Sequence, residues 1–116
     1  NNGSGQFSFK AFPVEAQFAP INDILVKDCD GDGQSELLLV QNSYQSDVET
    51  GRYDAGNGVM LSRAASGAWT VIPNAVSGFW ATEEARAIKV LHEANGKELV
   101  LIANNDSALE AYQLLH

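Results

Sequence analysis

Cysteine and histidine are almost absent from this chain of 116 residues. With Cys29 as the single cysteine, no intramolecular disulfide can form. A catalytic thiol needs a neighbouring base, and the sequence offers none beside Cys29. The two histidines belong to no arrangement of nucleophile, base and acid, and acid pairs such as Glu83 and Glu84 lack a spacing that catalysis requires. We therefore expect no catalytic residue and no enzyme activity.

Positive charge is also scarce. The chain holds 7 Lys and Arg against 15 Asp and Glu, which gives a net charge of −8 and an isoelectric point of about 4.5. Nucleic acids and anionic membrane surfaces attract basic faces, so both are disfavoured as partners. No apolar run approaches the roughly 20 residues of a membrane span. A hydrophobic fraction of 45% over this length predicts one folded domain rather than disorder.

What the sequence does contain is a stretch of alternating acids at residues 28–36. Three aspartates take positions 1, 3 and 5 of a loop, and a glycine at position 6 permits the sharp turn that such a loop needs. Position 7 would offer a backbone carbonyl, and position 9 a carboxylate that binds directly or through water. Oxygen donors at this spacing suit Ca²⁺; the alternative is an acidic, solvated turn without metal. The predicted ligands of one calcium ion per chain are Asp28, Asp30, Asp32, Gln34 and Glu36.

The acidic loop does not fit an EF-hand. An EF-hand has a bidentate Glu at position 12, where this chain has Leu39. The loop also lies between two short apolar runs, 24–26 and 37–40, instead of between two helices. A calcium loop that closes a β-hairpin is the better interpretation.

Short alternating or apolar runs predict strands along the rest of the chain. Phe7 and Phe9 fall on one side of an alternating run that Pro13 ends, which predicts a strand over 6–12. The segment 83–91 fits either a short helix or a strand, and the internal repeat described below favours the strand. Eight strands are expected, at 6–12, 21–27, 37–42, 59–61, 68–72, 87–91, 99–102 and 109–114.

A long polar stretch at 43–58 and one aromatic residue are candidates for contact with a ligand. Loops of such length without regular structure are often functional. The alternative for this stretch is an ion pair of Arg52 with Asp54 or Asp47 that merely orders the loop. Trp80, next to Phe79 in a connector, is the aromatic most expected to be exposed; it would stack on a sugar or pack between sheets. The candidate contacts are Tyr44, Arg52, Tyr53, Asp54 and Trp80.

The two halves of the chain repeat each other. Residues 4–7 match 66–69 at an offset of 62, and residues 36–42 match 98–104 at the same offset. The region 92–97 of the second copy lacks the alternating aspartates, is predicted to be one residue shorter, and contains the turn dipeptide Asn95-Gly96. We therefore expect the second copy to bind no calcium.

The acidic loop, the strand that follows it and the repeat together resemble FG-GAP/VCBS-type repeats, the blades of integrin-alpha-like β-propellers. This resemblance implies an all-β fold of two four-stranded propeller blades, within a larger propeller or in a ring closed by oligomerisation. It implies a latching strand at 1–13, a calcium-binding blade at 14–73 and a second blade at 74–116. In the family, this loop joins the first two strands of a blade and usually carries Asp where this chain has Glu36.

The same resemblance implies a function. We expect a calcium-binding module of an exported protein, located outside the cell, in the periplasm or at the cell surface. The ion would be structural, and the module would bind a protein or a carbohydrate, as in adhesion. The alternatives are a purely structural, self-assembling propeller module, a non-catalytic appendage of a carbohydrate-active enzyme, and a lyase or hydrolase. The expected partners are further copies of the chain or the remainder of a larger propeller.

Overall fold

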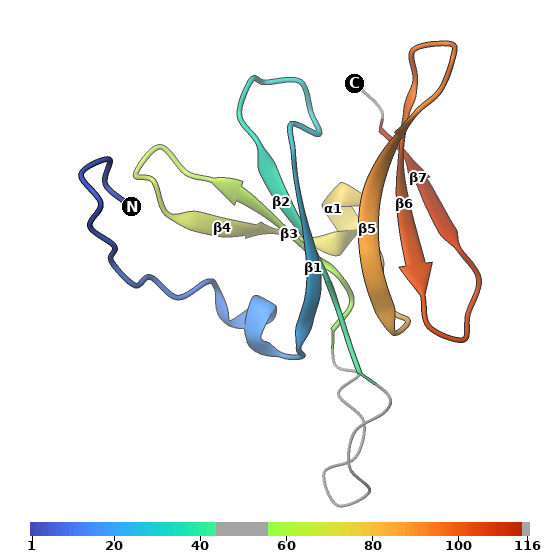
Figure 1. Cartoon of the computed structure of the whole chain (residues 1–116), viewed down its shortest axis with the longest axis horizontal. Helices are drawn as coiled ribbons and strands as arrows, with labels where there is room; N and C mark the ends of the chain where they lie inside the picture. Colours follow the sequence, from blue (N-terminus) through green and yellow to red (C-terminus); the bar gives the residue numbers. More distant parts are fainter. Residues whose placement is uncertain (44–55, 115–116) are drawn as a thin grey trace, which may run out of the picture.

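The computed structural model describes residues 1–43 and 56–114 and shows an all-β chain with two antiparallel sheets (Figure 1). The first sheet has the order β1-β2-β3-β4 and the second the order β5-β6-β7. The part of the chain described contains no helix with the length and apolarity that crossing a membrane requires. The strands are β1 (Ile21–Lys27), β2 (Glu36–Gln41), β3 (Val59–Arg63), β4 (Trp69–Ile72), β5 (Ala85–His92), β6 (Glu98–Asn104) and β7 (Glu110–Gln113), with a 3-10 turn η1 (Val14–Gln17) and a short helix α1 (Asn74–Ser77).

The strand predicted at 6–12 is absent, and this part of the prediction is wrong. The segment is extended but pairs with no described strand, and the side chains of Phe7 and Phe9 are 82% and 93% exposed. Alternation specifies which side chains share a face, but a strand forms only where another strand accepts its backbone hydrogen bonds. The second sheet therefore has three strands instead of four, and the described residues close no propeller ring.

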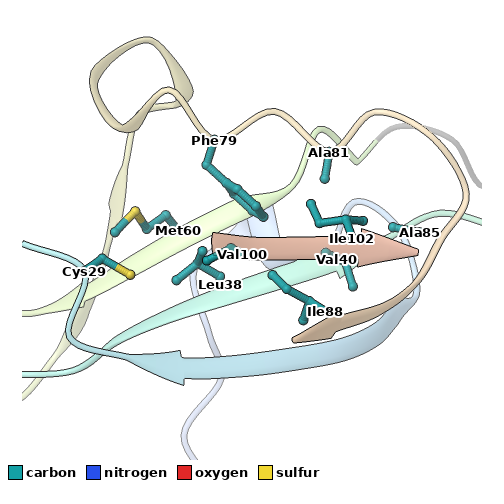
Figure 2. Packing of buried hydrophobic residues seen from close by; sticks show 10 residues of the cluster. All are labelled: Cys29, Leu38, Val40, Met60, Phe79, Ala81, Ala85, Ile88, Val100 and Ile102. Carbon is teal, nitrogen blue, oxygen red and sulfur yellow. The ribbon is translucent and has the colours of Figure 1, made fainter. Parts of the chain in front are cut away.

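Two apolar clusters form on the two faces of the first sheet. The central strand β2 is buried along its whole length, because its even positions face the second sheet and its odd positions face η1. Leu38 and Val40 meet Val100 and Ile102 of β6 in the cluster between the sheets (Figure 2). A strand covered on both faces needs a continuous apolar run, and residues 37–40 supply it. The second cluster contains Ala16, Leu37, Leu39, Val59 and Leu61.

The first hairpins of the two sheets have corresponding registers. Lys27 pairs with Glu36 at the loop end of β1-β2, and His92 pairs with Glu98 at the loop end of β5-β6. At the end away from the loop, each hairpin has a shift in its pairing register, between Ile21 and Asp23 in the first and between Ala85 and Ala87 in the second. The connecting loops are 28–35 and 93–97, so the second is three residues shorter instead of the one predicted. It closes through Glu93 N–H, which donates to Lys97 O at 2.8 Å.

Polar side chains join β1 to β5, which run side by side in Figure 1. The Asp23 carboxylate accepts the Ile88 N–H across the sheets at 3.0 Å and the Ile24 N–H at 2.9 Å. The Asn22 amide donates to the carbonyls of Asn42 and Ala85, both at 2.7 Å. These contacts fix the inner edges of the two sheets relative to each other.

Replacing Asp23 by alanine is expected to cost about 2 kcal/mol of unfolding free energy at neutral pH, because two backbone donors lose a charged acceptor. The Ile88 N–H is the largest influence on the Asp23 pKa and lowers it; burial raises it, while Ile24 and Lys89 lower it further. A lowered folded-state pKa means that this stabilisation is present above the ordinary value of 3.8 and is lost as the pH falls through the folded-state pKa.

The pH dependence of this stabilisation is measured by denaturant unfolding of the wild type and of Asp23→Ala. Each protein is unfolded at neutral pH and again at a pH well below the ordinary pKa of 3.8. The difference between the two proteins should shrink at acid pH. Glu15→Ala, which removes a partly exposed acid in η1, is the matched control and should show a much smaller difference at either pH. A difference for Asp23→Ala that does not change with pH would contradict a role for its charge.

Candidate metal centre

The loop 28–35 between β1 and β2 is shaped by its own carboxylates. Asp28 Oδ1 accepts the Gly31 N–H at 2.7 Å, and Asp28 Oδ2 accepts the Gly33 N–H at 2.9 Å. Both glycines have left-handed backbones, with φ of 80° and 88°, a conformation that glycine adopts without a steric penalty. The alternation of Asp and Gly in the sequence therefore folds the chain around the side chain of Asp28.

Three carboxylates converge in this loop. Asp28, Asp30 and Glu36 each place one oxygen within 4.8 Å of the others, and Glu36, the first residue of β2, is only 3% exposed. The buried Glu36 Oε2 also accepts the Cys29 N–H at 2.8 Å, which holds the carboxylate against the base of the loop. A cluster of carboxylate oxygens without nitrogen or sulfur donors fits a hard cation such as Ca²⁺.

Two neighbouring acids of the cluster have pKa values shifted in opposite directions. Burial is the largest influence on Asp28 and would raise its pKa, but several backbone N–H donors, Gly31 and Gly33 foremost, together lower it. Burial raises the pKa of Glu36, and repulsion from Asp30 and the other loop aspartates raises it further, against the Cys29 N–H. A cation among these carboxylates would offset the cost of ionised Glu36, because it replaces repulsion by attraction.

Asp32 does not join this group. Its Oδ1 accepts the Gln34 N–H at 2.7 Å, so its side chain caps the next turn of the loop. Calcium ligation by Asp32, and by the backbone carbonyl of the exposed Gln34, stays a prediction. Glu36, the position that departs from the resembled family, is by contrast inside the group.

Cys29 faces the core and not the acidic group. Its side chain belongs to the cluster between the sheets, as Figure 2 shows, and its Sγ donates to Lys27 O at 3.5 Å. Burial raises the Cys29 pKa to about 11, and the neighbouring Glu36 adds to the effect. A thiol with this pKa is protonated at neutral pH, which agrees with a structural role for Cys29.

The predicted ligand-contact residues fall into two groups. Tyr44, Arg52, Tyr53 and Asp54 lie outside the described residues. Trp80 lies in the connector between the sheets and is 46% exposed, as predicted, whereas its neighbour Phe79 is buried against Tyr112. The Trp80 backbone oxygen accepts the Tyr112 hydroxyl, so the connector is held while the indole faces solvent.

Asn42 is a polar residue of structural importance that the sequence-based expectations did not include. It is fully buried, and its Nδ2 lies 2.8 Å from Gly56 O, 3.0 Å from Glu83 O and 3.1 Å from Thr82 O. The signal was present in the repeat, because Asn104, the last residue of β6, is the equivalent of Asn42 and also donates to a backbone carbonyl, Ala108 O at 2.9 Å. In both halves an asparagine fixes the chain that leaves the second strand.

Comparisons with family models, with curated proteins and with solved structures give no match to this chain. The resemblance to FG-GAP/VCBS repeats therefore stays a prediction based on the loop residues and on the offset of 62. The structure shows the coarser feature, an all-β chain in two antiparallel sheets.

Proposed function

We propose that this chain is a calcium-binding β-propeller module of an exported protein, in which the ion is structural and exposed loops bind a protein or a carbohydrate. One observation carries the proposal: Asp28, Asp30 and Glu36 converge within 4.8 Å at the closed end of the β1-β2 hairpin. Three carboxylates from both ends of one loop form a donor set that a divalent cation fits.

A structural role for the ion follows from where the acids lie. Asp28 follows β1, Glu36 begins β2, and Cys29 between them packs into the cluster shared by both sheets. A cation that holds these acids together would fix the loop to the core. The binding free energy would then add to the free energy of folding.

The ligand-binding part of the proposal is supported by Trp80. A half-exposed indole on a connector held by hydrogen bonds offers a rigid apolar face, which suits stacking on a sugar ring or contact with a protein side chain. Screening of glycans and proteins with the wild type and with Trp80→Ala tests this part. A ligand that binds both proteins equally would remove Trp80 from the binding site.

Calcium titration of the chelated protein tests the metal part. We expect one ion per chain by calorimetry and native mass spectrometry. At a calcium concentration of 100 times Kd, linkage predicts about 2.7 kcal/mol of added stability, and thus a rise in Tm of roughly 10 °C. Magnesium, which demands a stricter octahedral geometry, should raise Tm less. Absence of binding heat together with an unchanged Tm would overturn the metal site.

A further inference from the structure

The second sheet has an open edge at β7. Within residues 1–43 and 56–114, no strand pairs with the outer side of β7. In the first sheet the corresponding strand β3 is covered by β4, where Met60 pairs with Ile72 and Leu61 with Val71. An open edge presents unpaired backbone N–H and C=O groups that favour the addition of another strand.

The N-terminal turn at residues 2–6 has the backbone geometry of the β3-β4 turn. Asn2 N–H donates to Gln6 O at 3.0 Å, and Ala64 N–H donates to Ala68 O at 2.8 Å, so the two bonds are related by the offset of 62. The glycine before the segment repeats as well, with φ of 82° at Gly5 and 83° at Gly67. Residues 6–12 therefore follow a turn of the same geometry as the turn that leads into β4.

The environments of the two equivalent segments differ. Trp69 and Val71 of β4 pack against the buried cluster of the first sheet, whereas their equivalents Phe7 and Phe9 contact mostly water. Two phenylalanines on one side of an extended segment form an apolar surface that is unfavourable in water and marks an interaction site.

The segment and the open edge complement each other in charge. Residues 1–12 contain one base, Lys10, and no acid, whereas residues 105–114 contain Asp106 and Glu110 and no base. The two elements lie apart in one copy: the segment runs on the β4 side of the first sheet, and β7 is at the opposite side of the molecule (Figure 1). A single copy therefore does not bring the two elements together.

We propose that residues 6–12 of one copy pair with β7 of a second copy as the fourth strand of its second sheet. The first sheet supplies the register. Tyr112 pairs with Val100 as Met60 pairs with Leu38, so β7 corresponds to β3. In the first sheet Met60 pairs with Ile72, and the offset of 62 makes Lys10 the equivalent of Ile72. The same pairing in the second sheet therefore places Lys10 opposite Tyr112 and Ser8 opposite Leu114.

This pairing also brings opposite charges together. Lys10 becomes the diagonal neighbour of Glu110 on the same face of the sheet. Because each copy donates one segment and accepts another, the association is head-to-tail and produces a ring or an open chain. It requires no calcium, so its test is independent of the proposed metal site.

Light scattering and sedimentation of the wild type, in calcium and in chelator, test the association. We expect oligomers of the wild type at micromolar concentrations. The double variant Phe7→Ser, Phe9→Ser should associate at least tenfold more weakly while its Tm at high dilution is unchanged, because both side chains are exposed in a single copy. Val76→Ser, which removes another apolar side chain that is 76% exposed, is the matched control and should associate as the wild type does. A monomeric wild type, or a double variant that assembles normally, would overturn the proposal.

Cysteine cross-linking tests the register. A copy with Ser8→Cys is mixed with a copy that carries Leu114→Cys, and the buried Cys29 stays in place. Oxidation should give a disulfide-linked dimer of the two variants, and the off-register mixture of Ser8→Cys with Glu110→Cys should give much less. Equal cross-linking of both mixtures would contradict the proposed pairing.

Discussion

Replacing Asp30 by alanine is expected to weaken calcium binding roughly 100-fold or more, because the site loses one of three converging carboxylates. The variant should fold normally. Asp30 is exposed, and its side chain accepts one loop hydrogen bond, from the Asp32 N–H at 3.1 Å. Calorimetric titration of the chelated protein with calcium measures the loss, and thermal unfolding in chelator confirms the fold.

Asp32→Ala is the matched control for this experiment. The sequence pattern treats Asp30 and Asp32 as equivalent ligands, whereas the structure brings only Asp30 into the carboxylate group. We therefore expect Asp32→Ala to weaken calcium binding clearly less than Asp30→Ala. Unchanged affinity in Asp30→Ala would contradict the ligand assignment, and equal losses in both variants would favour the sequence pattern over the observed geometry.

The comparison of these two aspartates shows what spacing can predict about a site. Spacing identified the acids and the turn glycine Gly33, because a left-handed glycine is a local property of the chain; it did not identify Gly31, which is also left-handed. It could not predict that the Asp32 carboxylate would cap the Gln34 N–H instead of joining the group. That choice depends on backbone angles inside the loop, which the order of residues does not specify.

The fold was predictable to the same extent. The apolar run 37–40 predicted β2 correctly, because a strand that is buried on both faces needs a continuous apolar run. The alternating run at 6–12 shows the limit, since its pattern was strand-like but it pairs with no strand among the described residues. Contacts between the sheets, such as Asp23 with Ile88, join positions 65 residues apart and depend on how β1 and β5 dock.

Asn42 is the residue where this docking is most sensitive to mutation. Its fully buried Nδ2 donates hydrogen bonds to the carbonyls of residues 56, 82 and 83, and its Oδ1 accepts the Gly56 N–H at 2.9 Å. One side chain therefore holds the end of the first sheet to the connector that enters the second sheet. Alanine has neither donor nor acceptor, so several buried backbone groups would lose their partner at once.

Asn42→Ala is expected to reduce the unfolding free energy by roughly 3–4 kcal/mol and Tm by about 15 °C, as measured by denaturant and thermal unfolding. The left-handed backbone at Asn42, with φ of 86°, adds a penalty for alanine, and Asn42→Gly separates this penalty from the lost hydrogen bonds. Asn104→Ala, at the equivalent and less buried position, should cost clearly less. If Asn42→Ala and Asn104→Ala were equally destabilising, Asn42 would have no special role in joining the sheets. If Asn42→Ala loses more unfolding free energy than Asn104→Ala, and Asn42→Gly does not recover that loss, the side-chain amide of Asn42 joins the two sheets.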